Sequence, residues 1–276
     1  MSLNSVNTNS GALIALQNLN STGSQLDTVR NRIATGLKIG SARDNGAIYA
    51  IAQNQRSESA ALDSVKESLQ RGQSVLDVAS TAGASVSDLL IQLKAKALAA
   101  SDTGLDTAGR SALNEDFKAL RDQITKVVSN AEFNGVNLLD GTKANIQALA
   151  NADGSSHLTV AAQTLSLGGS IVTLATTETI GTATHAASVL TTITSSIAAV
   201  STALAKIGTG SKSLESHLTF VGKLQDTIDA GIGNLVDADL AKESARLQAL
   251  QTKQQLGVQA LSIANSSTSS LLGLFR

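Results

Sequence analysis

The sequence predicts a mainly α-helical protein: a long antiparallel helical, coiled-coil-like rod with a small β-hairpin region and paired N- and C-terminal helices. Three observations lead to this fold class. The 276 residues contain no proline, a residue that would interrupt long helices. Apolar residues recur every three or four positions over long stretches, as on the buried face of a helix. Between about residues 132 and 185, short alternating segments and glycine-containing turns replace this pattern.

The first and longest of the central helices is expected to begin near Ile48 and to extend to Ala100. Its apolar positions repeat every seven residues, which is typical of a coiled-coil seam. One set of seam positions is Ile48, Leu62, Leu69, Leu76, Leu90 and Ala97, and a companion set includes Ile51, Val65, Ala79, Val86 and Leu93. A helix of this length would extend for roughly 80 Å, which is too long for a compact globule.

Two further helices are predicted in the central part of the chain. One follows the loop at 101–104 and has the seam Leu113, Phe117, Leu120, Ile124, Val127 and Ala131. The other has a regular seam that includes Ile193, Ile197, Val200, Leu204, Ile207, Leu214, Val221, Ile228 and Ile232. None of these helices can bury its apolar face alone, so we expect them to form a bundle.

The region at about 132–185 is predicted to be a small β region. Leu158-Thr159-Val160 and the segment 170–174 alternate as short strands do, and 151–154 and 168–169 supply turns. Low-complexity structure is the alternative for residues 175–187. The serine and threonine residues at 173–194 also invite O-glycosylation, unless they are plain strand and turn residues.

Both ends of the chain combine apolar spacing with an absence of charge. Residues 1–26 and 254–275 have no charged side chain. Their apolar positions, with flanking residues, are Ala12, Leu16, Leu19, Leu26, Ile33 and Leu37, and then Leu240, Leu247, Leu250, Leu261, Ala264 and Leu271. Exposed helix faces of soluble monomers usually carry lysine and glutamate, so these helices are suited to packing against other chains. The alternative, for the free monomer, is a pair of disordered tails.

Composition also excludes several partners. The formal net charge is −1, so we expect no nucleic-acid partner. The longest early apolar run, at 13–16, is far shorter than the 20 or so residues that cross a bilayer, and we expect no membrane span. The first basic residue is Arg30, so we expect no cleaved secretory signal peptide.

Residues that could carry catalysis or bind a metal are few and scattered. The chain has no cysteine, and its three histidines lie far apart, at 157, 185 and 217. The segment 208–213 suggests a phosphate-binding loop, but it lacks the second glycine and lies within a helical seam. Asp237, Asp239 and Glu243 could hold a cation, although carboxylates at a helix start are the better interpretation. We expect no catalytic residue, no cofactor, no metal site and therefore no enzyme.

Three sequence blocks, in order along the chain, closely resemble bacterial flagellin. The first, at 31–44, reads NRIATGLKIGSARD; the second, at 132–141, reads EFNGVNLLDG; the third, at 236–244, reads VDADLAKES. The ending LLGLFR is an altered form of the family's L-L-R ending. Motif positions, which the resemblance assigns to the family pattern and to assembly, are Arg32, Ile33, Gly36, Leu37, Ile39, Ser41, Asp44, Phe133, Asn134, Gly135, Asp237, Asp239, Glu243 and Leu271.

The resemblance implies a short flagellin, a structural subunit that polymerises into the bacterial flagellar filament for swimming motility. It assigns 1–35 and 236–276 to an inner-tube domain, 36–44 to a linker, and 45–235 to an outer-tube domain whose β region is at about 132–185. It further implies type III export to the extracellular filament without a cleaved signal peptide. The implied partners are further copies in a homo-polymer, an export chaperone, and the filament cap and junction proteins.

The same resemblance identifies two altered positions. Flagellins that the vertebrate innate receptor detects resemble L-Q-R-V-R-E-L-A-V where this chain has residues 90–98. The first arginine of that pattern is Gln92 here, and the leucine after the glutamate is Lys96. Because buried arginine and leucine residues commonly carry interface binding energy, we expect a poor receptor agonist.

The sequence is compatible with two other functions. A hook–filament junction protein has similar ends but usually lacks the full block at 31–44. A coiled-coil adaptor would bind a partner without polymerising, and electron microscopy of reassembled protein would distinguish it.

Overall fold

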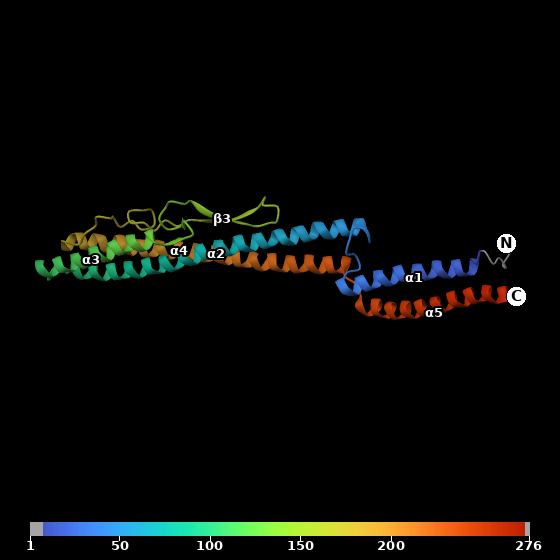
Figure 1. Cartoon of the computed structure of the whole chain (residues 1–276). Coiled ribbons are helices and arrows are strands. Elements are labelled where there is room, and N and C mark those ends of the chain that lie inside the picture. Colours follow the sequence, from blue (N-terminus) through green and yellow to red (C-terminus); the bar gives the residue numbers. More distant parts are fainter. Residues whose placement is uncertain (1–7, 274–276) are drawn as a thin grey trace. The chain divides into compact units, whose positions relative to one another are not determined.

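The computed structural model describes residues 8–273, and it describes side chains up to residue 266. The described residues form five helices: α1 (Ser10–Thr35), α2 (Gly46–Ala100), α3 (Thr107–Ser129), α4 (Ala183–Val236) and α5 (Leu240–Gly273). Four short strands lie between α3 and α4: β1 (Glu132–Phe133), β2 (Val136–Asn137), β3 (Asn145–Leu149) and β4 (His157–Ala161) (Figure 1). The predicted mainly helical fold with a small β-hairpin region and paired terminal helices is confirmed.

The chain divides into two compact units. Unit 1 comprises Met1–Ser57 and Thr227–Arg276, and unit 2 comprises Glu58–Asp226. Helices α2 and α4 each contribute to both units, because each crosses a unit boundary within its length. This division rests on packing, and the predicted assignment of residues to inner- and outer-tube domains stays a prediction.

The core of unit 2 follows the predicted seams. Leu62, Leu69, Leu76, Leu90 and Leu93 of α2 are buried, and so are Ile193, Val200, Ile207, Leu214 and Val221 of α4. Gly83 brings the two helices close together, because a Cβ at this glycine would lie 2.7 Å from Cδ2 of Leu204. In α3 the predicted Phe117 and Ile124 are fully buried, and the next buried position is Val128, one residue beyond the predicted Val127.

The β region consists of two antiparallel hairpins. β1 pairs with β2 through Glu132–Asn137 and Phe133–Val136, and β3 pairs with β4 over five residue pairs. The strand predicted at Leu158-Thr159-Val160 lies within β4. Its partner β3 was not predicted, because NIQAL is short and has a single β-branched residue, Ile146, so its strand signal is weak.

The strand predicted at 170–174 is wrong. This segment has no strand partner, although Val172 and Leu174 are fully buried. The N–H of the intervening Thr173 donates to the Ser196 hydroxyl of α4 at 3.2 Å. Alternate side chains therefore enter the core while a helix side chain satisfies the backbone, which reproduces a strand-like pattern without a strand.

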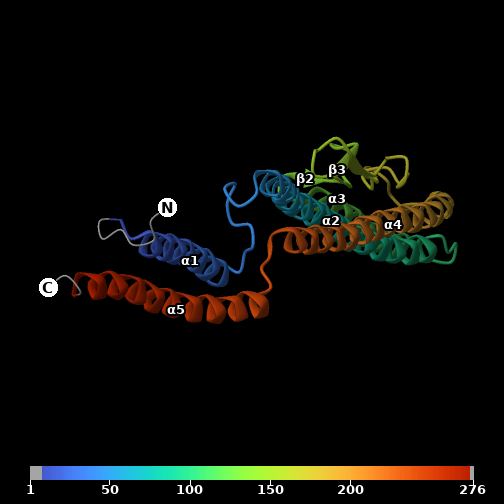
Figure 2. The same ribbon diagram turned by 90° about the vertical axis from the view of Figure 1, so that its right-hand side faces the viewer.

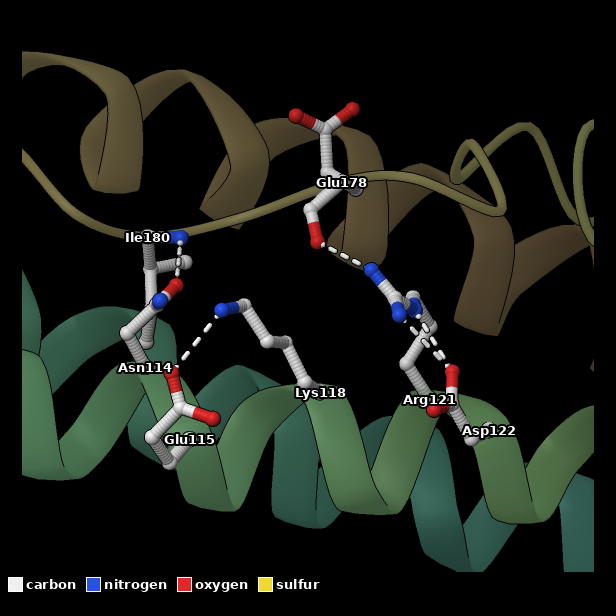
Figure 3. A network of polar contacts seen from close by, with 7 residues as sticks. All are labelled: Asn114, Glu115, Lys118, Arg121, Asp122, Glu178 and Ile180. Carbon is white, nitrogen blue, oxygen red and sulfur yellow. Dashed lines mark hydrogen bonds and ion pairs between the residues drawn. The ribbon is translucent and has the colours of Figure 1, made fainter.

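The segment that contains Glu178 and Ile180 runs alongside α3 and is held there by side chains of that helix. Arg121 Nη1 donates to the carbonyl of Glu178 at 2.7 Å, and the N–H of Ile180 donates to Asn114 Oδ1 at 2.8 Å (Figure 3). Ile180 is fully buried, and α4 begins three residues later at Ala183. Residues 175–187, for which low complexity was the alternative, are thus a packed segment without regular secondary structure that continues into α4.

Two helices are long and apolar enough to cross a membrane by length and composition alone, namely α2 and α4. Long core helices of proteins without any membrane segment meet the same criterion, and many apolar side chains of these two helices form the core of unit 2. The expected absence of a membrane span stays a prediction.

Candidate assembly site at the terminal helices

Helices α1 and α5 lie side by side and antiparallel in unit 1 (Figure 2). Near one end of the pair, Asn9 Nδ2 donates to the carbonyl of Ala264 at 2.7 Å. Leu26, Val29 and Leu250 form a small buried core between the helices, with Ile33 and Leu247 packed against it. The two ends of the sequence thus form the pair that their apolar spacing predicted.

An ion pair joins the other end of the two helices. Arg32 Nη1 lies 3.1 Å from Glu243 Oε1, and their side chains are 26% and 10% exposed. Glu243 was predicted to start a helix, and it does lie in the first turn of α5. Its contact with Arg32 was not predicted, because no local pattern connects residues so far apart in sequence.

The start of α5 is capped by a neighbouring carboxylate. Asp239 Oδ1 accepts the N–H of Lys242 at 3.1 Å, as expected for an N-cap residue that satisfies a free backbone donor. The described residues contain no group of His, Cys, Asp or Glu that could hold a metal ion. Asp239 and Glu243 have the helix-starting geometry that the sequence favoured, whereas Asp237 directly follows the end of α4.

The segment after α1 pairs with the segment before α5. Gly36 ends α1 with a φ of 72°, which reverses the chain and suits a residue without a Cβ. Leu37 forms an antiparallel bridge with Asp237, and the N–H of Ala238 donates to the carbonyl of Gly36 at 2.8 Å. The predicted linker is thus held in register by backbone hydrogen bonds.

A second small core anchors this linker. The N–H groups of Lys38 and Ile39 donate to the carbonyl of Val236 at 2.7 and 3.2 Å. Ile39 is buried in a cluster with Ala52, Ile232 and Val236. Motif positions from the first and third blocks therefore meet at one place.

Ser41 and Asp44 form the turn that precedes α2. Asp44 Oδ2 accepts the Ser41 hydroxyl and the Ser41 N–H, each at 3.0 Å, and the Gly40 N–H at 3.2 Å. These hydrogen bonds, led by the one from the Ser41 hydroxyl, hold the pKa of the Asp44 carboxyl below its usual range. The motif residues Ser41 and Asp44 thus fix the chain direction into α2.

The middle motif block lies in unit 2 and is not part of this site. Phe133, Asn134 and Gly135 belong to the β1–β2 hairpin. Asn134 and Gly135 form its two-residue turn, with φ values of 50° and 77°, and both residues of a type I′ turn need positive φ. Phe133 is 38% exposed.

The outer faces of the α1–α5 pair expose large apolar side chains. These are Leu13, Ile14 and Leu16 of α1, and Leu240, Leu256, Val258 and Ile263 of α5. Leu16 and Leu240 belong to the predicted apolar faces and are 43% and 50% exposed in the single chain, because α1 and α5 bury only a narrow stripe against each other. Leu271 lies within α5, but its side chain lies outside the described residues.

A groove of about 550 Å³ runs along the same helix pair. Its lining includes Ile14, Leu19 and Thr22 of α1 and Leu256 and Ala260 of α5. Thus apolar surface is exposed on a helix pair with few charged side chains. Such surface on a soluble chain marks an interaction site.

The two altered positions of the receptor segment lie on α2. Gln92 is exposed. Lys96 Nζ lies 2.6 Å from Asp116 Oδ2 of α3, so its ammonium group is paired within the chain.

Fold and site together define a structural helical protein with paired ends that expose apolar faces. Residues 6–144 match the family model for the bacterial flagellin N-terminal helical region, and residues 190–275 match the one for the C-terminal helical region. The chain belongs to the bacterial flagellin family and is a structural subunit of the flagellar filament, which is extracellular. This family is structural and not enzymatic.

Relatives match along the whole chain. Flagellin FljM and flagellin FljO of Caulobacter vibrioides are 61% and 60% identical to it over 276 residues, which cover 100% of each chain. A flagellin of Brucella melitensis is 38% identical and covers 99% of each chain. A solved structure described as a flagellar hook-associated protein from Vibrio parahaemolyticus shares the fold alone, with a TM-score of 0.56 and 16% identity over 70% of this chain and 100% of that one.

Proposed function

We propose that the chain polymerises through the α1–α5 pair, and that neighbouring copies cover its exposed apolar faces. The observation that carries this proposal is the exposure of Ile14, Leu256 and Ile263, which are 59%, 58% and 69% exposed on helices with few charged side chains. Burial of one such side chain contributes about 1.5–3 kcal/mol, and every subunit repeats it. In the free monomer this surface is unfavourable, so assembly and final ordering of the ends are coupled.

Reassembly of purified protein, examined by electron microscopy, tests the polymerisation. Ile263→Asp is expected to abolish tube formation, because it places a charge on a face that a neighbour must cover. Thr202→Asp is the control, since Thr202 is exposed on α4 in unit 2. Tubes of normal length from Ile263→Asp would contradict the proposal, and an absence of tubes from the unaltered chain would favour a non-polymerising adaptor.

We also propose that 1–35 and 236–276 line an inner tube, that 36–44 is a linker, and that 45–235 form an outer tube. The pairing of Leu37 with Asp237 supports a boundary at these residues, since both terminal helices begin or end beside it. Limited proteolysis of monomer and filament is the test. Residues 1–35 and 236–276 should be cleaved in the monomer and protected in the filament.

We propose that the chain is exported with α1 still attached and that no signal peptide is cleaved from it. Leu26 and Val29 supply most of the α1 side of the small core with Leu250, so a chain that had lost α1 could not form the pair. The intact mass of subunits from sheared filaments would show whether α1 is present. An export chaperone, the cap and the junction proteins are the proposed partners, and co-purification of each one with this chain tests them.

The receptor hypothesis gains support from the Lys96–Asp116 pair. A lysine that is paired with a carboxylate replaces the apolar side chain of the resembling segment, so the surface there is polar and locally neutralised. We propose that the purified monomer is a poor agonist, and that Gln92→Arg with Lys96→Leu raises its activity in a receptor reporter assay. A nanomolar response to the unaltered monomer would contradict this hypothesis.

A further inference from the structure

The chain contains two Asn–Gly dipeptides, Asn45–Gly46 and Asn134–Gly135. In such a pair the glycine backbone nitrogen can attack the asparagine side-chain carbon Cγ, because glycine has no Cβ to obstruct the approach. A bond forms between that nitrogen and Cγ, the Cγ–Nδ2 bond breaks, and Nδ2 leaves as ammonia. Water then opens the five-membered succinimide, and the product is aspartate or isoaspartate. Sequence alone does not distinguish the two sites.

The structure holds the Asn45 side chain away from this reaction. Its Oδ1 accepts the N–H groups of Ala47 and Ile48, both at 3.1 Å, at the start of α2. Its own carbonyl accepts the N–H of Tyr49 at 3.0 Å. Rotation of the Asn45 amide toward Gly46 would break both side-chain hydrogen bonds and uncap the helix.

Asn134 is in a different environment. It lies exposed in the β1–β2 turn, and among the described residues its side-chain amide has no hydrogen bond. The hairpin around it has only two residue pairs, so it can open locally at low cost. Opening would allow the Gly135 nitrogen and the Asn134 side chain to approach each other.

The two Asp–Gly dipeptides resemble Asn45 rather than Asn134. Asp140 Oδ1 accepts the N–H and hydroxyl of Thr142 at 2.8 and 2.7 Å. Asp153 Oδ1 accepts the N–H and hydroxyl of Ser155 at 3.1 and 2.9 Å. Of the four such dipeptides in the described part of the chain, only the one at Asn134 has an untethered side chain.

We propose that Asn134 is a site of spontaneous deamidation, a modification that adds one negative charge to the β1–β2 turn. The turn borders a groove whose lining includes Asn134, Arg71 and Lys143, so the new carboxylate would arise on a surface with two cations. Isoaspartate would also lengthen the backbone of the turn by one atom and disturb the β1–β2 register.

Peptide mapping of the full-length protein, incubated in mildly alkaline buffer, tests the proposal. Trypsin releases Asn134 in the peptide 127–143 and Asn45 in the peptide 44–56, and each conversion raises the peptide mass by exchange of an amide for an acid. In the folded protein Asn134 should convert at least about tenfold faster than Asn45, whose two hydrogen bonds must break first. In urea the two rates should converge, because a glycine follows both residues.

Equal rates in the folded protein, or a faster reaction at Asn45, would overturn the proposal. A difference that persists undiminished in urea would also overturn it, since local sequence and not structure would then be the cause. Asn134→Gln should remove the acidic species, because its longer side chain does not close a five-membered ring. If that variant fails to fold, the comparison of the two sites in the unaltered chain still decides the question.

Discussion

Arg32 of α1 and Glu243 of α5 form an ion pair across 211 positions of sequence, with 3.1 Å between Nη1 and Oε1. Through this contact, a side chain of the first motif block binds a side chain of the third. It lies next to the backbone bridge between Leu37 and Asp237, so side-chain and main-chain contacts fix the same junction.

Glu243→Gln is expected to lower the stability of the α1–α5 pair by about 1–3 kcal/mol, because it leaves a partly buried guanidinium without its carboxylate. Hydrogen exchange of α1 and α5 in the full-length chain would measure the change. Asp27→Asn is the matched control, since the Asp27–Arg30 pair is 3.9 Å apart and its side chains are 74% and 59% exposed. That control should change stability by less than about 0.5 kcal/mol. Equal effects from both variants would contradict the assigned role of Glu243.

Gly36→Ala and Gly23→Ala should have opposite effects on α1. Gly36 has a φ of 72°, where an alanine Cβ is strained by about 1–2 kcal/mol. Gly23 lies within α1 and a Cβ there would meet no atom within 4 Å, so alanine should stabilise the helix by about 0.5–1 kcal/mol. Thermal unfolding followed by circular dichroism gives the sign of each change, and a stabilising Gly36→Ala would contradict the reversal at this residue.

Gly210→Ala should destabilise unit 2, whereas Gly208→Ala should not. A Cβ at Gly210 would lie 2.6 Å from Cγ1 of Val160, whose β-branched side chain has little freedom to move aside. The expected cost is about 1–3 kcal/mol of unfolding free energy. A Cβ at Gly208, on the same helix, would meet no atom within 4 Å. Urea denaturation measures both, and similar midpoints for the two variants would contradict the close approach of Val160 in β4 to Gly210 in α4.

The Ser41–Asp44 turn should weaken at acid pH. The folded-state pKa of Asp44 is lowered from 3.8, so its hydrogen bonds stabilise the turn above that pH. The contribution is lost as pH falls below 3.8 and through the lower folded-state pKa. An NMR titration of the Asp44 carboxyl carbon would follow this change. Ser41→Ala should raise the pKa toward its usual value, and an unchanged titration would show that the Ser41 hydroxyl is not the main cause.

Much of the helical fold follows from the sequence. The seven-residue repeat placed Leu62, Leu69 and Leu76 on one face of α2. Because that apolar face must be buried, α2 packs against other helices. The prediction failed where a residue is apolar but lies outside the helix contact. Ile51 fits the repeat and is nevertheless 49% exposed, because at this level the buried face of α2 passes through Ala52, with Ile48 and Tyr49 packed beside it.

The β region was predictable only in part. β4 has two β-branched residues, Thr159 and Val160, whereas its partner β3 has only Ile146, and pairing energy lies in cross-strand contacts that a single segment does not display. The segment at 170–174 has the alternation and no strand, because Ser196 of α4 satisfies the backbone that a partner strand would otherwise pair.

The sequence by itself determined the helices, the motif blocks and the family to which the chain belongs, because helix periodicity and short motifs are local properties. Only the tertiary structure decided that Arg32 meets Glu243, that Gly36 lies beside Ala238, and that Leu16 is left exposed. Such contacts depend on the angle and register at which two distant segments pack, and a long-range pair is fixed by the whole set of packed side chains rather than by either segment alone.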